Sequence, residues 1–356
     1  MAADSPLFPA ACRVSVAPMM QRTDRHCRYF HRLLAPEAGL YTEMVHAQAV
    51  VHSTDGRFLH HHPAERPLAL QLGGSEPETL AEATALATQA GIDEINLNVG
   101  CPSSRVKAGR FGACLMHEPE RVADCVRAMR GEAAGRPVTV KTRIGTNHRQ
   151  EFSHLLAFAR AMQEAGVAAL IVHARIAVLE GLSPKENRNV PPLRYEFVYR
   201  LKQAMPELPI VINGGICDNS EIASHLQCVD GVMLGRAAYS NPWLLTALSG
   251  APRQPKTRAG VVEAMVEYAR REEQSGVRLG AITRHMAGLY SGRPGAGDWR
   301  RSLARHAAAP ANEASVLLDC VPDRLRYAAP GSEGVSPSWR AGRPPSRVED
   351  QVAFSG

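Results

Sequence analysis

Residues 93–103 read DEINLNVGCPS, a short apolar segment that ends in an asparagine, a glycine, a cysteine and a proline. Similar segments recur along the chain, and the clearest are LALQLGG (68–74), VTVKTRIG (138–145), LIVHAR (170–175), IVINGG (210–215) and GVMLGR (231–236). Such runs are typical of parallel strands buried on both faces. Their ends carry polar side chains that no core requires: Gln71, Asn98, Cys101, Lys141, His173, Asn213 and Arg236. A (β/α)8 barrel builds its active site at the carboxyl ends of its strands, so the pattern predicts an α/β fold of this kind, a TIM barrel.

The spacing of the segments supports the same fold. Candidate strands begin near residues 13, 40, 68, 94, 138, 169, 209 and 230, with helical patterns between them. One helix is predicted from a capping box at 75–78 to a C-cap at Gly91. Two others, over 119–130 and 153–166, have apolar residues at helical spacing.

The chain of 356 residues is longer than one barrel requires. We expect the barrel over 12–250 and a helical domain over 255–310, with amphipathic helices at 261–273 and 279–290. Residues 311–356 are rich in Pro, Ser, Gly and Arg, a composition that predicts a disordered tail.

Composition excludes few functions. The apolar fraction of 45% is that of an ordinary soluble protein, and the net charge of +6 is compatible with a polyanionic partner without requiring one. No segment has the length of a membrane span, and the first residues lack the features of a secretion signal, so we expect a cytoplasmic protein without membrane contact. The eight cysteines contain no CxxC pair, which argues against a zinc or iron–sulfur site.

The glycine-rich ends of the last two strands are candidate phosphate-binding loops. Glycine allows close backbone approach, and exposed N–H groups bind anions. Asn213-Gly214-Gly215 and Gly235-Arg236 stand where barrels commonly hold a phosphate. A tight turn is the better interpretation of each motif alone, but together they favour a phosphorylated cofactor or substrate.

Three polar residues at strand ends have alternative interpretations. Lys141 could stabilise negative charge on the pyrimidine edge of a reduced flavin, or extend from the barrel rim to solvent. His173 is a ligand-binding or a packed histidine, and Gln71 binds a heterocycle or caps a turn.

Cys101 is the sharpest candidate for chemistry. It lies between Gly100 and Pro102 at the predicted catalytic rim, where a thiol could donate a proton or act as a nucleophile. Cys114 is left open. We expect four other cysteines to be buried packing residues: Cys12, Cys125, Cys217 and Cys228.

Two basic clusters could contact nucleic acid. Lys185 and Arg188 lie in a polar insertion after the sixth strand, and Arg300-Arg301 follows Trp299 near Arg284 and His285. From composition alone, a solvated charged surface is the preferred interpretation of both clusters.

Taken together, the motifs resemble the tRNA-dihydrouridine synthase family and its A-type branch. The matching segments include APMM (17–20), ALQLGGS (69–75), DEINLNVGCPS (93–103), GRFGACLM (109–116), VTVKTRIG (138–145), VHAR (172–175), GLSPKENR (181–188), INGGI (212–216), GVMLGRAAYSNP (231–242) and ITRHM (282–286). The resemblance covers about residues 12–306.

The resemblance implies a flavin-binding barrel with a helical tRNA-binding domain. FMN would be held by Pro18, Met19, Met20, Gln71, Lys141, His173, Asn213, Gly214, Gly215, Gly235 and Arg236. NADPH would reduce the flavin, which passes hydride to C6 of a uridine while Cys101 protonates C5. Asn98 would contact the uridine, and Lys185, Arg188 and Arg300 would orient the tRNA. The implied targets are uridines 20 and 20a of the D-loop, and we expect a monomer.

Several positions depart from the branch. Gln21-Arg22 replaces Asp-Trp, Ile176 and Val178 replace a lysine and a tryptophan, and Gly297 stands where an arginine is common. The last change bears on the RNA contact and hence on the target. Two alternatives are a flavin-dependent reductase of a free pyrimidine, similar to dihydroorotate dehydrogenase, and a non-catalytic RNA- or phosphate-binding barrel.

Overall fold

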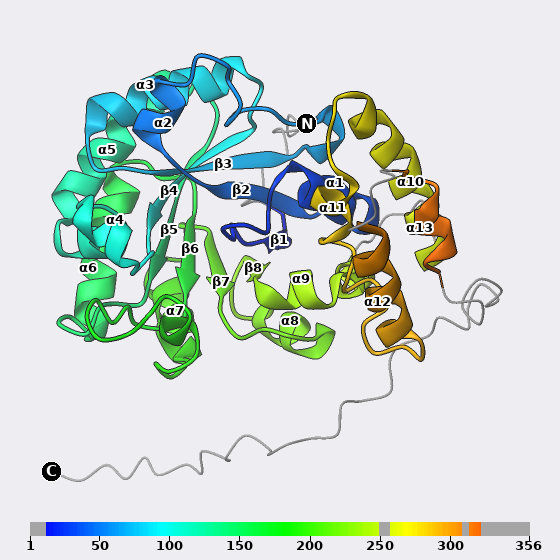
Figure 1. Cartoon of the computed structure of the whole chain (residues 1–356). Coiled ribbons are helices and arrows are strands. Elements are labelled where there is room, and N and C mark those ends of the chain that lie inside the picture. The colour runs from blue at the N-terminus through cyan, green and yellow to red at the C-terminus, as the bar shows by residue number, and fades with distance from the viewer. Residues whose placement is uncertain (1–11, 249–256, 308–312, 322–356) are drawn as a thin grey trace, which may run out of the picture.

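Eight parallel strands close into a barrel in sequence order, so the predicted fold is confirmed (Figure 1). The computed structural model describes residues 12–248, 257–307 and 313–321. Each strand starts at the predicted residue or one residue away from it. The strands are β1 (Val14–Val16), β2 (Gly39–His46), β3 (Leu68–Gly73), β4 (Glu94–Val99), β5 (Val138–Arg143), β6 (Leu170–His173), β7 (Ile210–Asn213) and β8 (Gly231–Leu234).

Helices cover the outside of the barrel. They are α1 (Arg25–Leu34), α2 (Ala47–Val51), α3 (Pro77–Gln89), α4 (Ser104–Ala108), α5 (Pro119–Glu132), α6 (Phe152–Glu164), α7 (Tyr195–Ala204), α8 (Asn219–His225) and α9 (Arg236–Ser240). Short 3-10 turns add η2 (Pro63–Glu65), η3 (Gly112–His117), η4 (Glu186–Arg188) and η5 (Pro242–Leu248). The helices predicted over 119–130 and 153–166 are confirmed as α5 and α6.

The capping box predicted for α3 is wrong, although the helix itself forms. Glu76 is the N-cap residue and makes no side-chain cap hydrogen bond, and the Ser75 hydroxyl lies 3.4 Å from the Glu76 carboxylate. The C-terminal end follows the expectation more closely. Gly91, with φ of +87°, comes directly after the C-cap residue Ala90 and allows the chain to turn away from the helix.

The barrel interior is part apolar and part polar. A small apolar cluster fills one part: Ala17, Tyr41, Ala69, Ala169, Ile171, Val211 and Met233. A second group of buried interior residues is polar: Gln71, Glu94, Asn96, Asn98 and Thr139. Every second residue of β4 belongs to this polar group, because alternate side chains of a barrel strand point inward.

A smaller helical unit packs beside the barrel (Figure 1). It consists of α10 (Arg258–Gln274), α11 (Leu279–Thr283), α12 (Ala296–Ala307) and α13 (Val316–Asp319), and both α10 and α11 contact α1. The helix expected over 261–273 lies within α10. The helix expected over 279–290 is wrong beyond Thr283, where the chain forms turns around the buried Trp299, whose indole N–H donates to the Met286 carbonyl at 3.0 Å.

The disordered tail expected from residue 311 is contradicted over 313–321. There α13 packs against α10 and α12, and the side chain of Leu317 is fully buried. A few apolar residues at the start of a polar segment were enough to dock it, which composition averaged over the whole segment concealed. Residues 322–356 lie outside the described part of the chain. Among the helices within the described ranges, none has the length and apolar character needed to cross a membrane.

Candidate active site

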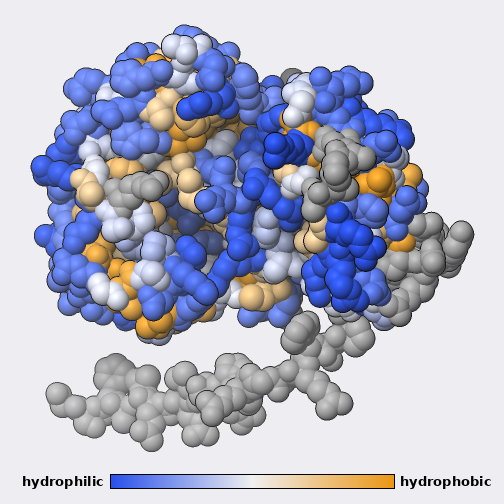
Figure 2. Space-filling model, in the orientation of Figure 1, coloured by the Kyte–Doolittle hydropathy of each residue, from blue (hydrophilic) through white to orange (hydrophobic). Residues whose placement is uncertain are grey.

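A cavity of about 1680 Å³ lies at the carboxyl ends of the barrel strands. Figure 2 shows this face of the molecule as mostly hydrophilic, with a shaded hollow over the barrel. Most of the residues predicted from sequence line the cavity: Pro18, Met19, Met20, Gln71, Asn98, Cys101, Lys141, His173, Arg188, Asn213, Gly214, Gly215, Gly235 and Arg236. Residues from all parts of the barrel therefore meet in one space.

The loop after β4 brings Cys101 to the cavity. The Asn98 side-chain oxygen accepts hydrogen bonds from the backbone N–H groups of Gly100 and Cys101, at 3.1 and 2.9 Å. On the other side of the loop, the Arg143 guanidinium donates to the Gly100 carbonyl at 3.0 Å. The start of the loop is thus held from both sides.

The far side of Cys101 is held by the GRFGACLM segment. The N–H of Ala113 donates to the Cys101 carbonyl at 3.0 Å. Gly112 adopts φ of +73°, and a Cβ there would lie 2.6 Å from the Cys101 carbonyl oxygen, so only glycine fits. The half-buried thiol lies 3.7 Å from the Ser103 hydroxyl.

Lys141 extends from β5 into the cavity. Its ammonium group donates to the Asn213 side-chain oxygen at 3.0 Å, while the Asn213 amide nitrogen donates to the Met233 carbonyl at 2.7 Å. Burial, with a smaller contribution from the nearby charge of Arg143, lowers the pKa of Lys141 to about 7. An amine in this state gains strongly from an anionic ligand, which would restore its charge.

His173 is held as a neutral ring next to the glycine turn. Burial lowers its pKa well below the ordinary value, and the charges of Arg143 and Lys141 act in the same direction. Gly214 has φ of +117°, and a Cβ at that position would lie 2.5 Å from the His173 ring. The backbone of the turn therefore approaches the imidazole as closely as only glycine allows.

Basic side chains form the rim of the cavity. The Arg236 guanidinium donates to the Asn189 side chain at 2.7 Å and to the Arg188 carbonyl at 3.3 Å. The Arg22 guanidinium stacks 4.6 Å above the centre of the Tyr239 ring. These contacts place positive charge around the opening, where a polyanion would approach.

Two predicted basic residues do not line the cavity. Lys185 is exposed in the loop after β6, and Arg300 is exposed on α12. The surface over α12 is strongly hydrophilic in Figure 2. Both lie outside the site itself, and a role in binding a large substrate remains a prediction.

The expectation for two cysteines is wrong. Cys12 and Cys125 are buried as expected, whereas Cys217 and Cys228 are exposed, and Cys217 lines the cavity. Cys217 follows the Gly214-Gly215 turn and Cys228 lies in the turn before β8. Near turns of this kind, apolar neighbours in the sequence do not indicate that a residue is buried.

The sequence interpretation overlooked Arg143 and Asn187. Arg143 donates to the carbonyls of Ile176 and Asn187 at 2.8 and 3.0 Å, and thereby ties the loop after β6 to the loop that carries Cys101. The fully buried Asn187 bonds both the N–H and the carbonyl of Val178. An arginine at the end of an apolar strand, two residues after Lys141, was a signal that could have identified the first of them.

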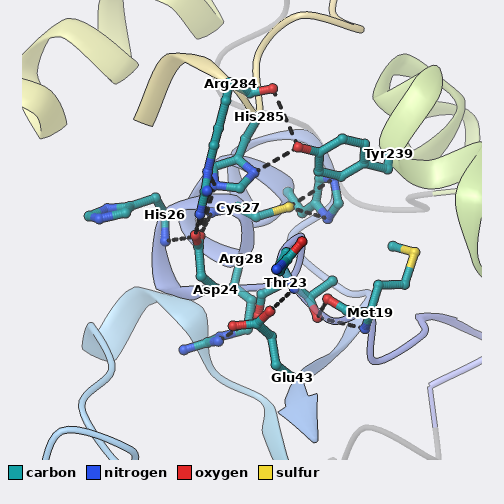
Figure 3. A network of polar contacts seen from close by, with 12 residues as sticks. Met19, Thr23, Asp24, His26, Cys27, Arg28, Glu43, Tyr239, Arg284 and His285 are labelled. Atoms are coloured by element: carbon teal, nitrogen blue, oxygen red, sulfur yellow. Dashed lines mark hydrogen bonds and ion pairs between the residues drawn. The ribbon is translucent and has the colours of Figure 1, made fainter. Parts of the chain in front are cut away.

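The helical unit is fastened to the barrel near the cavity (Figure 3). Asp24 caps the N-terminus of α1 by accepting from the N–H groups of His26 and Cys27, at 3.1 and 3.0 Å. The same carboxylate forms an ion pair with Arg284 and contacts the His285 ring at 3.0 Å. One side chain therefore joins α1 to the end of α11, a few residues after Met19 and Met20 of the cavity wall.

Comparison with known proteins agrees with this architecture. A family model described as dihydrouridine synthase (Dus) matches residues 15–325. A tRNA-dihydrouridine(20/20a) synthase of Xanthomonas axonopodis pv. citri (strain 306) is 52% identical over 314 residues, which is 87% of this chain and 93% of that protein. The proteins of the same name from Vibrio parahaemolyticus and Synechocystis sp. are 51% and 50% identical, over 87% and 92% of this chain and 96% and 95% of theirs.

The barrel, the cavity at its carboxyl end and the cysteine-bearing loop after its fourth strand agree with one class of enzyme, the dihydrouridine synthases. This chain belongs to the dihydrouridine synthase family. Among solved structures, a morphinone reductase in complex with tetrahydroNAD is similar with a TM-score of 0.48 and 14% identity, over 66% of this chain and 86% of that one.

Proposed function

We propose that this protein reduces uridine to 5,6-dihydrouridine at positions 20 and 20a of the tRNA D-loop, with FMN as cofactor, NADPH as reductant and Cys101 as proton donor. The observation that carries the proposal is the position of Cys101 on a held loop that faces the same cavity as Lys141 and His173. The names of the relatives, which cover most of this chain, support the substrate.

The residues of the cavity fit FMN. Gly214 and Gly215 have positive φ and open a backbone cradle that side chains would fill, which suits a phosphate or ring edge. Gly235 and Arg236 add N–H groups and a positive charge beside them. Lys141, whose positive charge an anionic ligand would restore, would bind the electron-rich edge of the flavin, with Gln71 and His173 as further hydrogen-bonding partners.

The chain's own residues would orient the base and deliver the proton. When bound, FMN reduced by NADPH supplies the hydride for C6 of the pyrimidine. Asn98 would hold the ring, and the Cys101 thiol would give its proton to C5, leaving a thiolate that takes up a proton again from solvent. Arg143 would hold the Cys101 loop in place through its bond to the Gly100 carbonyl.

The basic rim would receive RNA. A uridine inside folded tRNA must leave its stack to enter the cavity. Arg188 and Arg22 at the opening would contact RNA phosphates, with Lys185 and Arg300 as more distant contacts. Such contacts fix the orientation of the nucleic acid and make binding sensitive to salt.

The test compares Cys101→Ala with Cys114→Ala, a second half-buried cysteine that does not line the cavity. Loss of the proton donor should lower dihydrouridine formation on unmodified tRNA by about 100-fold to 10,000-fold, with flavin content and reduction by NADPH retained. Cys114→Ala should keep wild-type turnover. Full activity of Cys101→Ala would remove the proposed acid, and turnover of free uracil at a rate comparable to tRNA would favour the reductase of a free pyrimidine.

A further inference from the structure

The two bonds between Asn98 and the Cys101 loop belong to a longer chain of hydrogen-bonded side chains inside the barrel. The Asn98 oxygen receives the N–H groups of Gly100 and Cys101, and the Asn98 amide nitrogen donates to the Gln71 oxygen at 2.8 Å. The Gln71 amide nitrogen in turn donates to the Asn96 oxygen at 2.7 Å. The chain thus runs from the rim of the cavity into the barrel.

The chain ends at a buried carboxyl group. The Asn96 amide nitrogen donates to the Thr139 hydroxyl at 2.8 Å, and that hydroxyl donates to the Glu94 oxygen Oε1 at 2.5 Å. Tyr41 donates to the same oxygen at 2.8 Å. Glu94, Asn96, Thr139 and Tyr41 have no exposed surface. Each donor in the chain points away from the cavity and toward Glu94.

Both ends of the chain impose this direction. A backbone N–H can only donate, so the Asn98 oxygen must face the loop. At the other end, a carboxylate oxygen can only accept, so the Thr139 hydroxyl donates to Glu94 whether or not a second donor is present. Reversal of all the amides would put two donors face to face at the loop and leave the Glu94 oxygen without the Thr139 donor, which is costly in a buried site.

We infer that Glu94 is a positioning residue: through this chain it fixes the amide orientation of Gln71 and Asn98, and with it the loop that carries Cys101. Glu94 touches neither cofactor nor substrate. The inference rests on the proposed function for its effect on catalysis, although the hydrogen-bond chain itself does not depend on it.

The fixed orientation also sets what the cavity presents to a ligand. Each amide nitrogen of Gln71 and Asn98 uses one of its two hydrogens in the chain, and both residues line the cavity. The second hydrogen of each could then serve a hydrogen-bond acceptor of the ligand, such as a carbonyl oxygen of uracil or of a flavin ring. A reversed amide would offer an oxygen instead and select a different ligand edge.

Thr139 and Tyr41 provide a matched pair for the test. Both donate a hydroxyl to the same Glu94 oxygen, but only Thr139 lies between Glu94 and Cys101. Thr139→Val cuts the chain with little change in shape, and Tyr41→Phe removes a hydroxyl beside it. Thr139→Ser restores the hydroxyl without the methyl group and separates hydrogen bonding from packing.

The first measurement is hydrogen exchange of the Gly100 and Cys101 amides in the flavin-loaded protein, read by mass spectrometry. The second is the single-turnover rate of dihydrouridine formation by the pre-reduced enzyme, compared with the rate of flavin reduction by NADPH. In Thr139→Val we expect both amides to exchange about tenfold faster and tRNA reduction to slow about tenfold, while flavin reduction stays near the wild-type rate. Tyr41→Phe should stay within about twofold of the wild type, and Thr139→Ser should recover most of the lost protection.

The outcomes separate this inference from the proposed function. A wild-type protein that makes no dihydrouridine overturns the proposed function, while the exchange data still report on the chain. Equal effects of Thr139→Val and Tyr41→Phe, or no change at either amide in Thr139→Val, overturn the inference. If Thr139→Val does not fold, Glu94→Gln answers the same question. It keeps the shape but lets the reversed arrangement form at the buried end, and should also speed exchange at both amides.

Discussion

Replacement of Lys141 by methionine should stabilise the flavin-free protein while weakening its hold on the flavin. Methionine has a similar length and no charge, so it can fill the space now occupied by the methylene groups of the lysine. In the fold the lysine amine is buried, and burial lowers its pKa from 10.5 to about 7. The protein therefore keeps at this site a group that folding disfavours, which is expected of a residue retained for a ligand.

The size and sign of the effect follow from the pKa. Between about pH 7 and 10.5 the unfolded chain binds a proton at Lys141 that the folded protein does not, so the unfolded state is favoured and stability rises with pH. At ~1.4 kcal/mol per pH unit, the cost reaches roughly 5 kcal/mol at pH 7 and below, as an upper limit. Loss of the 3.0 Å bond to Asn213 offsets part of the gain. A net stabilisation of about 2 kcal/mol at pH 7 is expected.

Urea unfolding of the flavin-free proteins between pH 6 and 10 measures this difference. The advantage of Lys141→Met should shrink by ~1.4 kcal/mol for each pH unit above 7. Lys185→Met, at an exposed lysine, is the control and should show no such slope. Added FMN should stabilise the wild type more than the variant, so that the order of their melting temperatures reverses. A variant that is no more stable at pH 7, or a difference independent of pH, would refute the reasoning.

Three further substitutions test the site and its supports. Gly214→Ala would bring a Cβ to 2.5 Å from the ring of His173, so the purified protein should fold but lose its visible flavin absorbance; normal absorbance would argue against the cradle. Glu65→Gln leaves Arg28 without the partner of a buried 2.6 Å ion pair, and urea unfolding should show a loss of about 3 kcal/mol, whereas a neutral result would mean that water reaches the pair. Asp24→Asn should speed hydrogen exchange in α11 more than in the barrel strands, and a uniform increase would contradict its role as a local fastener.

Sequence was sufficient for the barrel because buried parallel strands leave a strong local signal. Each strand combined a continuous apolar run with a polar or glycine-rich end, and the ends converge at one rim whatever the details of the helices. The cavity residues could be found for the same reason. The glycines at 214 and 215 had a second signal, because a Gly-Gly pair after a strand indicates positive φ and close approach of neighbouring groups, and here His173 and Leu193 lie where a Cβ would be.

Features that depend on tertiary contacts were not visible in this way. The predicted capping box at Ser75 failed because the side chain bonds elsewhere, and the helix predicted to 290 stops at Thr283 because Trp299 packs across the following turns. Part of the hydrogen-bond chain between Glu94 and Cys101 was visible in the sequence as polar residues at 94, 96 and 98. Its other members, Gln71 and Thr139, come from β3 and β5. Only the closed barrel brings those strands together.

The shared use of Asp24 has a consequence for recombining such proteins. By position Asp24 belongs to the barrel, yet its carboxylate is also the anchor for Arg284 and His285. A chimaera that exchanges only the C-terminal helices would place new side chains opposite the original Asp24, at the edge of the cavity. An exchange that preserves these contacts should therefore include the first turn of α1 together with the helices.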